Sequence, residues 1–265
     1  MEKSYRRLEN KVAFITGAGS GIGKASAIQM AKEGAKVALA GLTLETLEEV
    51  NAQITESGGE ALTLQTDISD EQSITDAYAA VLDRWGKLDI VFANAGINGT
   101  LSPIEEMRQE EWNKTIQTNL TGTFLTLKHA IPALKKQGGS IIITSSINGN
   151  RVFSNFGMSA YSTSKAGQVA LMQMAALELA QFRIRVNAVC PGAIETNIDE
   201  STDRKKEVED ITIPVEFPEG DHPLRDAPGQ AEQVASLITF LASDEASHIT
   251  GTPIYIDGAE SLLRG

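Results

Sequence analysis

The residue pair best suited to acid–base chemistry is Tyr161 and Lys165, in the run Tyr161-Ser162-Thr163-Ser164-Lys165. Side chains four positions apart lie on the same face of a helix. An ammonium group beside a phenol favours the phenolate, so we expect Lys165 to lower the pKa of Tyr161 from about 10. Such a phenol can exchange a proton with an alcohol near neutral pH. The same spacing is common on ordinary surface helices, so its meaning depends on the residues around it.

A glycine-rich string near the N-terminus follows a short apolar run and leads into a stretch of helical periodicity. Glycines allow a tight turn that brings bare backbone against a pyrophosphate, and the helix N-terminus offers free N–H groups and partial positive charge. Such a string can be a simple turn, but the strand–turn–helix context is the one that dinucleotide binding requires. The string reads Thr16-Gly17-Ala18-Gly19-Ser20-Gly21-Ile22-Gly23.

The end of the second predicted strand normally selects the cofactor, through an acid for NAD or a base for NADP. Here the end reads Ala40-Gly41-Leu42-Thr43 and carries neither. Because no carboxylate is present to repel a 2′-phosphate, the sequence favours NADP(H), while NAD(H) stays open.

Apolar runs of strand length alternate with helical stretches along the whole chain. This alternation predicts an α/β protein with a Rossmann-like, doubly wound, seven-stranded parallel sheet and helices on both faces. We expect an N-terminal tail over residues 1–10 and one domain over 11–265. A proline-containing segment, about 195–229, is long and irregular and is interpreted as a substrate lid or a mobile surface loop. The predicted strands are 12–16, 37–40, 61–65, 88–93, 140–144, 185–189 and 253–256.

Together these motifs resemble the short-chain dehydrogenase/reductase family, in its single-domain branch, over about residues 10–258. The resemblance implies a Rossmann fold, a nicotinamide cofactor, and hydride exchange between a carbonyl and a secondary alcohol. The residues that carry it occur in family order: Thr16-Gly17 to Gly21-Ile22-Gly23, Asp67, Asn94-Ala95-Gly96, Asn119, Ser145-Ser146, Tyr161 with Lys165, and Pro191-Gly192.

The resemblance assigns four catalytic residues. Tyr161 gives or takes the proton, and Lys165 binds the nicotinamide ribose and lowers the pKa of Tyr161. Ser146 donates to the substrate oxygen, with Ser145 as the alternative, and Asn119 holds a water in a proton relay. Asn119 and Ser146 can also be read as ordinary capping or turn residues.

The resemblance also assigns the cofactor site, with Asp67 and Ile68 at the adenine, Asn94 bracing adjacent strands, and the loop after Pro191 at the nicotinamide carboxamide. The full cofactor set is Gly17, Gly19, Ser20, Gly21, Ile22, Gly23, Leu42, Asp67, Ile68, Asn94, Ala95, Gly96, Tyr161, Lys165, Pro191, Gly192, Ile194 and Thr196.

The stretch between Ser146 and Tyr161 departs from the family pattern, because it is two residues longer than usual. We expect the extra residues to bulge within 148–157 and to border the substrate pocket. Amide groups there could bind hydroxyls, and phenylalanines could contact a ring or chain. The predicted substrate residues are Asn98, Ser146, Asn148, Phe153 and Phe156, and no metal site is expected.

The formal net charge is −12, which disfavours nucleic acid and anionic membrane surfaces as partners. The single cysteine, Cys190, allows no intrachain disulfide, and the N-terminus carries no apolar targeting run, so we expect a cytoplasmic protein. The last strand resembles one that packs between subunits in this family, which predicts a homotetramer.

Acidic residues outnumber basic ones in the predicted lid. The lid would therefore repel an acyl carrier protein, which is itself strongly acidic, so we expect a small free substrate: a polyol, sugar or cyclic alcohol and its ketone. Lid charges that point into solvent would be screened, which leaves a 3-oxoacyl-carrier-protein reductase as the alternative. A non-catalytic, dinucleotide-sensing protein is a third interpretation, although such proteins typically lose the tyrosine or the lysine.

Overall fold

The computed structural model describes residues 6–211 and 222–264. Residues 1–5 of the predicted tail and 212–221 of the predicted lid lie outside the described residues. A seven-stranded sheet forms the centre, in the order β11-β7-β6-β4-β1-β2-β3, with every neighbouring pair parallel. Its strands are β1 (Val12–Thr16), β2 (Lys36–Gly41), β3 (Glu60–Gln65), β4 (Ile90–Ala93), β6 (Gly139–Thr144), β7 (Ile184–Pro191) and β11 (Pro253–Ile256).

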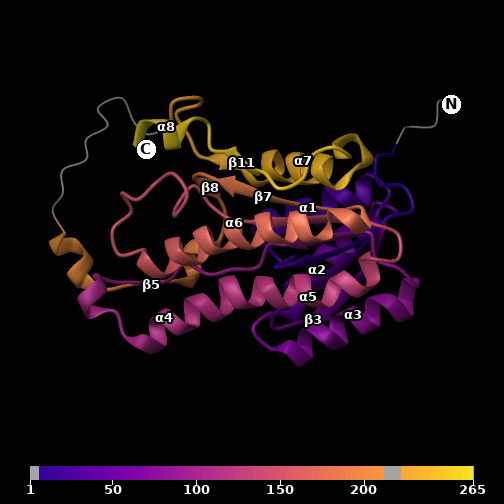
Figure 1. Ribbon diagram of the computed structural model, residues 1–265, viewed down its shortest axis with the longest axis horizontal. Coiled ribbons are helices and arrows are strands. Elements are labelled where there is room, and N and C mark those ends of the chain that lie inside the picture. The colour runs from indigo at the N-terminus through magenta and orange to yellow at the C-terminus, as the bar shows by residue number, and fades with distance from the viewer. Residues whose placement is uncertain (1–5, 212–221, 265) are drawn as a thin grey trace.

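Helices cover both faces of the sheet, as the alternation of patterns predicts (Figure 1). One core lies between the sheet and α3, α5 and α6, and the other lies between the sheet and α1, α2 and α7. The helices are α1 (Gly21–Lys32), α2 (Leu44–Glu56), α3 (Glu71–Trp85), α4 (Gln109–Ile116), α5 (Gly122–Leu134), α6 (Ser159–Leu179), α7 (Ala231–Ala242) and α8 (Glu260–Arg264).

The central strands are apolar on both sides because helices cover both faces. All residues of β1 and all residues of β4 are buried. Local signals set the helix ends: Asp70 accepts hydrogen bonds from two backbone N–H groups at the start of α3, and Gly86 ends that helix with φ of 72°. The expected doubly wound sheet is therefore confirmed.

Four short strands were not expected from the sequence. They are β5 (Gly99–Leu101), β8 (Ile194–Glu195), β9 (Thr202–Arg204) and β10 (Gly229–Gln230). β5 pairs with β9, and β8 pairs with β10. The described parts of the predicted lid are thus tied to the body of the molecule by backbone pairing.

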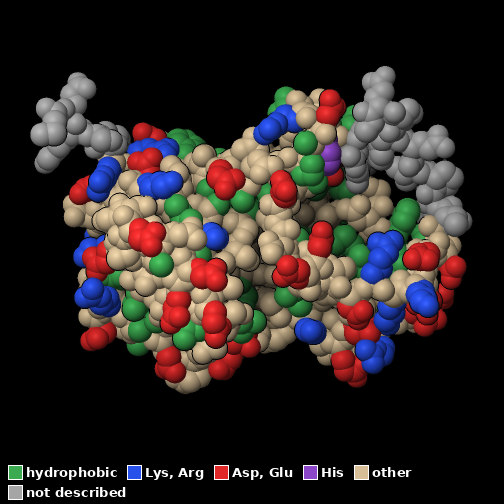
Figure 2. Space-filling model, turned by 180° about the vertical axis from the view of Figure 1, so that it is seen from behind, with side chains coloured by type: hydrophobic (Ala, Val, Ile, Leu, Met, Phe, Trp, Pro, Cys, Tyr) green, Lys and Arg blue, Asp and Glu red, His purple; other side chains and the backbone are tan. Residues whose placement is uncertain are grey.

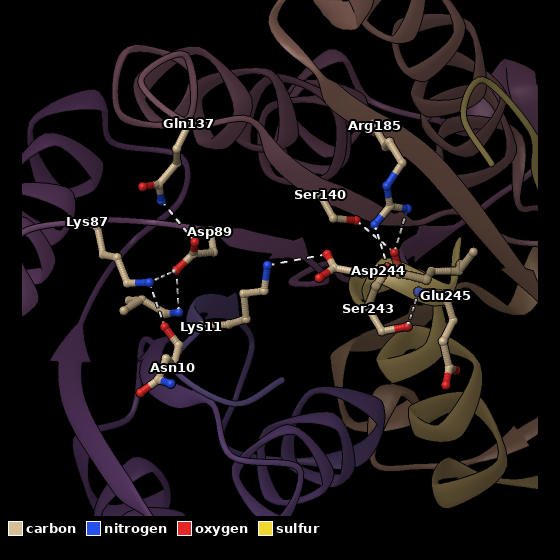
Figure 3. Close-up of polar contacts among 12 residues, drawn as sticks. Asn10, Lys11, Lys87, Asp89, Gln137, Ser140, Arg185, Ser243, Asp244 and Glu245 are labelled. Atoms are coloured by element: carbon tan, nitrogen blue, oxygen red, sulfur yellow. Dashed lines mark hydrogen bonds and ion pairs between the residues drawn. The ribbon is translucent and has the colours of Figure 1, made fainter. Parts of the chain in front are cut away.

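A polar network closes the amino end of the sheet, opposite the carboxyl ends of the strands (Figure 3). Arg185 donates to the carbonyls of Leu241 and Ser243, and Ser140 also donates to Leu241. These bonds satisfy carbonyls at the end of α7 that have no partner within the helix. Gln137 donates through one amide nitrogen to the carbonyl of Leu88 and to the carboxylate of Asp89.

In the described ranges, no helix is long and apolar enough to cross a membrane. Nor do those ranges hold a group of three or more His, Cys, Asp or Glu side chains that could bind a metal ion. On the face seen in Figure 2, acidic and basic side chains are intermixed and form no continuous basic surface.

Candidate active site

Most of the predicted site residues lie at or after the carboxyl ends of β1, β4, β6 and β7. The strand order changes direction between β1 and β4, which is where open α/β sheets bind ligands. A Cβ at Gly17 would lie 3.0 Å from the Cα of Ala95, and a Cβ at Gly21 would lie 3.2 Å from the side chain of Thr196. The glycine loop, the end of β4 and the loop after β7 therefore meet at one place.

The glycine loop is wound too tightly against its surroundings to accept side chains. Gly17 and Gly21 have positive φ, of 65° and 50°. A Cβ at Gly23 would collide with the carbonyl oxygen of Gly17. Ser20 precedes α1 but makes no side-chain capping bond, so the first N–H groups of the helix stay available for an anion. This geometry fits a dinucleotide pyrophosphate.

Asn94 braces the strands beneath the cofactor site. Its amide nitrogen donates to the carbonyls of Thr16 and Gly17, and its amide oxygen accepts from Thr144. Three strands are joined in this way, as the family resemblance implies. Thr16 also accepts hydrogen bonds from the backbone N–H groups of Asn94 and Ala95.

Ser146, Tyr161 and Lys165 come together at the end of β6 and the start of α6, all three buried. Burial raises the pKa of Tyr161 to about 12, and a side-chain hydrogen bond with Ser146 offsets part of the rise. The Ser146 hydroxyl also accepts a hydrogen bond of 3.1 Å from the backbone N–H of Asn148. A phenol and a hydroxyl thus lie next to each other, an arrangement in which both can contact one substrate oxygen.

The expectation that Lys165 lowers the pKa of Tyr161 is wrong for this structure. Burial lowers the pKa of Lys165 to about 8, because the ammonium is itself removed from water. The Lys165 ammonium donates to the carbonyl of Thr144 at 2.9 Å and lies 5.4 Å from the centroid of the Tyr161 ring. Desolvation of the phenol therefore sets the direction of its pKa shift, and the Lys165 charge is not among the causes.

Asn119 lies in a π-helical turn, Gln117–Thr121, between α4 and α5. Its side chain exchanges hydrogen bonds with the backbone of Ile97 and donates to Ser164, on α6. A Cβ at Gly96 would lie 3.1 Å from the Asn119 amide oxygen and 3.6 Å from the Lys165 ammonium. π-Helical turns are frequent at functional sites. The structure gives Asn119 a bracing role next to Lys165, and its part in a proton relay stays a prediction.

The structure separates the two neighbouring serines. Ser145 donates its hydroxyl to the carbonyl of Lys165 at 2.8 Å, whereas Ser146 contacts Tyr161. The geometry therefore favours Ser146 as the residue facing the substrate. Cys190 lies behind them with its side chain buried, and burial raises the pKa of its thiol to about 11.

The predicted adenine end lies at the ends of β2 and β3. Leu42 is 66% exposed. The carbonyl of Gly41 accepts a hydrogen bond from the Thr66 N–H, and that of Leu42 accepts one from the Gln65 side chain, both at the end of β3. Asp67 accepts hydrogen bonds from Ser69, and Ile68 is buried against Gly122. No charged residue stands at position 41 or 42 to choose between the cofactors.

The predicted nicotinamide loop leaves β7 at Pro191. The Gly192 N–H donates to the carbonyl of Ile256, and the Ala193 N–H donates to the buried carboxylate of Glu260 at 2.9 Å. The C-terminal helix α8 thus holds this loop. Glu260 was not expected from the sequence, because nothing in its local pattern distinguishes it from a surface glutamate.

The substrate side differs in part from expectation. Asn98 donates its amide to Thr202 and Asp199, so the structure places it as an anchor of the lid. Asn148 accepts a hydrogen bond from Asn155. A cavity of about 580 Å³ lies beside the catalytic group, and its lining includes neither Ser146 nor Tyr161. It is lined by Phe153, Phe156, Asn155, Met158, Ile104, Ile211, Ser102, Pro103, Glu105, Gly157, Ser159 and Ser162.

A second anchor holds the lid against α4. Lys205 donates to the Glu111 carboxylate at 2.8 Å and to the carbonyl of Glu106 at 2.7 Å. Glu111 also binds Arg108. Hydrogen bonds and charge from these partners hold the pKa of Glu111 at about 2, so its carboxylate stays ionised. Sequence spacing could not have linked Lys205 to a partner this distant in the chain.

Known proteins resemble this chain along nearly its whole length. A family model described as enoyl-(acyl carrier protein) reductase matches residues 17–259. Levodione reductase from Leifsonia aquatica is 36% identical over 258 residues, which cover 96% of each chain. The chain belongs to the short-chain dehydrogenase/reductase family.

Other family members extend the comparison. Trans-4-hydroxycyclohexanecarboxylate dehydrogenase from Sinomonas cyclohexanicum is 38% identical and covers 98% of this chain and 96% of its own. A solved 3-ketoacyl-ACP reductase from Sinorhizobium meliloti is 50% identical with a TM-score of 0.91, covering 96% of this chain and all of its own. Carveol dehydrogenase from Mycobacterium avium, solved with NAD, is 29% identical with a TM-score of 0.84, and the match covers 97% of this chain and 99% of its own.

Proposed function

We propose that this short-chain dehydrogenase/reductase transfers a hydride between a nicotinamide cofactor and a secondary alcohol or ketone on a small, uncharged, cyclic compound. The observation that carries the proposal is the buried Tyr161 phenol beside the buried Ser146 hydroxyl, with Lys165 one helical turn further on. Both groups needed to bind and protonate a carbonyl oxygen are present, which also favours an enzyme over a dinucleotide sensor.

The bound nicotinamide would supply or accept the hydride, and the side chains would handle the oxygen. In reduction, Tyr161 donates its proton to the carbonyl oxygen while Ser146 donates a hydrogen bond to the same atom. In oxidation, Tyr161 accepts the alcohol proton. Lys165 holds a positive charge beside this exchange below a pH of about 8, because that is the value to which burial lowers its pKa.

The glycine loop and the loop after β7 support binding of the cofactor along the carboxyl edge of the sheet. Gly17, Gly21 and Gly23 let the loop turn tightly against Ala95, Thr196 and its own backbone, and the uncapped start of α1 offers free N–H groups for the pyrophosphate. We propose NADP(H) as the preferred form, because the end of β2 carries no carboxylate. NAD(H) is the alternative, since carveol dehydrogenase was solved with NAD.

Relatives named for uncharged cyclic substrates, levodione reductase and carveol dehydrogenase, support the substrate class. Trans-4-hydroxycyclohexanecarboxylate dehydrogenase supports the cyclic alcohol alone, because its substrate carries a carboxylate. The described part of the lid supports it too, because its exposed charges are mostly negative and would repel an acidic carrier protein. The acids are Glu195, Asp199, Glu200, Asp203, Glu207, Glu209, Asp210 and Asp226, against the exposed cations Arg204, Lys206 and Arg225.

A 3-oxoacyl-carrier-protein reductase is the second candidate, because the solved neighbour from Sinorhizobium meliloti bears that name. Steady-state kinetics with acetoacetyl-carrier protein, beside a panel of cyclic ketones, cyclic alcohols, polyols and sugars, would separate the two. We expect turnover of the free cyclic compounds. Efficient reduction of the carrier-bound substrate, weakening as salt is raised, would overturn this proposal in favour of the second candidate.

Tyr161→Phe tests the chemistry. The change removes one hydroxyl and leaves the ring, so we expect kcat to fall by at least about a hundredfold while cofactor still binds. Turnover and cofactor fluorescence titration measure the two effects separately. A variant that kept more than about a tenth of the wild-type kcat would show that another group moves the proton.

We further propose a cytoplasmic homotetramer acting on small molecules. The cysteine content supports this location, since Cys190, the only cysteine of the chain, is buried and forms no disulfide.

A further inference from the structure

The turn that follows Ser146 is closed on itself and packed against α6. The carbonyl of Ile147 accepts hydrogen bonds from the backbone N–H groups of Asn150, Arg151 and Val152, at 3.1, 2.8 and 3.0 Å. Gly149 has a φ of 82°, and a Cβ at that position would collide with the backbone carbonyl oxygen of Ser162. The two residues by which this stretch exceeds the family spacing fall between Ser146 and Tyr161, where the chain forms this turn.

Asn150 directs its side chain from this turn back toward the catalytic serine. Its amide nitrogen donates to the carbonyl of Ser146 at 2.8 Å and to the hydroxyl of Ser145 at 3.1 Å. An amide NH₂ group has two hydrogens, so it can serve both acceptors. The Ser145 hydroxyl in turn donates to the carbonyl of Lys165 at 2.8 Å. One side chain therefore contacts Ser146 directly and Lys165 through Ser145.

We propose that Asn150 is a positioning residue that fixes Ser146 relative to the Tyr161–Lys165 segment of α6. Ser146 stands where β6 ends, and Tyr161 stands on a helix whose position is set separately by packing against the sheet. Asn150 and Ser145 connect the end of β6 to α6, because Asn150 bonds to Ser145 and Ser146, and Ser145 bonds to the carbonyl of Lys165. The inference rests on the proposed alcohol–ketone activity.

The link matters because a hydrogen-bond donor acts on a transition state only when it lies within a few tenths of an ångström of its proper place. Displacement by about 1 Å can cost about a hundredfold in rate. Ser146 has a second constraint from the Asn148 N–H, but that group belongs to the same turn and moves with it. Asn150 and Ser145 connect the turn to α6.

The test compares Asn150→Ala with Gln137→Ala. Gln137 is a matched control, because its one amide nitrogen also donates to a backbone carbonyl and to a side chain, at the opposite edge of the sheet (Figure 3). With the wild type's best substrate, we expect Asn150→Ala to lower kcat by about ten- to a hundredfold, with KM and cofactor Kd within about twofold. Gln137→Ala should keep its kcat within about twofold of the wild-type value, even if it lowers Tm as much as Asn150→Ala does.

A double-mutant cycle tests whether Asn150 affects kcat through its hydrogen bond to Ser145. If Asn150 acts through Ser145, the kcat of Ser145→Ala/Asn150→Ala should be no lower than that of the worse single variant, rather than the product of both losses. In oxidation, the pH profile of Asn150→Ala should also shift to higher pH, because a misplaced Ser146 stabilises the phenolate less. Multiplicative losses, or a kcat above about half of wild type, would overturn the proposal.

Backbone hydrogen exchange separates this inference from the proposed function. We expect exchange in the 145–152 turn to be faster in Asn150→Ala and unchanged in Gln137→Ala. If the wild type turned over no alcohol or ketone, the proposed function would fail while this measurement still decided whether Asn150 holds the turn. Unchanged exchange in the turn would overturn the positioning role whatever the substrate.

Discussion

Burial gives Tyr161 and Lys165 pKa shifts of opposite sign, and these shifts predict the pH dependence of the two reaction directions. The pKa of Tyr161 is raised to about 12, so the phenol keeps its proton throughout the neutral range. Reduction needs that proton and should stay flat from about pH 6 to 8. Oxidation needs the phenolate, so its kcat/KM should rise about tenfold per pH unit from about pH 7 to 10.

Initial rates in both directions, over one set of overlapping buffers, would measure this. An oxidation profile that levels off below about pH 8 would contradict the raised pKa of the phenol. It would show instead that Lys165 stabilises the phenolate during turnover, as the four-residue spacing alone predicts.

Leu42→Arg tests cofactor selection at the residue scale. The Leu42 side chain is 66% exposed at the end of β2, so an arginine fits there without repacking the core. If the position faces the 2′-phosphate, NADP(H) affinity should rise by about 1–2 kcal/mol through a charge-assisted contact. Titration with NADPH and NADH would measure it. Equal affinities before and after the change would show that position 42 does not face the ribose, and a clear wild-type preference for NAD(H) would refute the proposed NADP(H) preference.

Lid anchoring is a property of elements rather than of one residue. β9 pairs with β5, Asn98 binds Thr202, and Lys205 bonds to Glu111 on α4. Lys205→Met removes one of these links. If the segment acts as a lid, the change should raise KM for the alcohol or ketone about three- to tenfold, with kcat within about twofold, because the weakened lid would cover the substrate less often. Lys206→Met is the control, since it removes the same charge from the exposed neighbouring residue.

The pH dependence of that anchor follows from Glu111. Its pKa in the fold is about 2, against an ordinary value of 4.5. A lowered carboxylate pKa means that the anchor is fully present above about pH 4.5 and weakens as the pH falls through about 2. The KM difference between Lys205→Met and wild type should therefore stay constant from about pH 6 to 9. A difference that titrated within this range would contradict the ion pair as its cause.

The sequence predicts the long strands and helices well, but it predicts short strands and contacts between distant residues poorly. The strands of the main sheet were found because an apolar run between turn residues is a strong local signal, although β4 begins at Ile90 rather than two residues earlier. β8, β9 and β10 have only two or three residues and carry no period to detect. The spacing of Tyr161 and Lys165 located the site but not the sign of the pKa shift, because burial depends on the whole fold. Asn150 and Glu260 act through contacts that no local pattern records.

At the scale of the whole molecule, apolar side chains are exposed on a helical face. α5 and α6 run side by side across the near side of the molecule in Figure 1. Their exposed apolar residues include Phe124, Met174 and Leu177, which are 46%, 71% and 81% exposed. Ala170 is also exposed on α6, and its small side chain allows close approach of another helix. Ala170, Met174 and Leu177 lie on one face of α6 by their spacing, and exposed apolar residues gathered on one face mark an interaction surface.

The edge of the sheet offers a second surface, which is what a homotetramer with two-fold axes requires. β11 is the last strand of the sheet, and an uncovered edge invites pairing with another chain. Leu262 and Leu263 on α8 are exposed as well, and Figure 1 shows α8 beside the β11 end of the sheet. Two distinct self-complementary surfaces on one chain would close a tetramer, whereas one alone would stop at a dimer.

Charge placed on the helical face should therefore split the proposed tetramer without unfolding the chain. Met174→Asp combined with Leu177→Asp puts carboxylates opposite their own copies across a two-fold axis, where like charges repel. Light scattering at micromolar concentration should give the mass of four chains for wild type and of two for the double variant. Leu42→Glu, an apolar-to-acid change at an exposed site on the end of β2, should leave four chains assembled. A monomeric wild type would refute the assembly, and a double variant still of four chains would show that the contact uses another face.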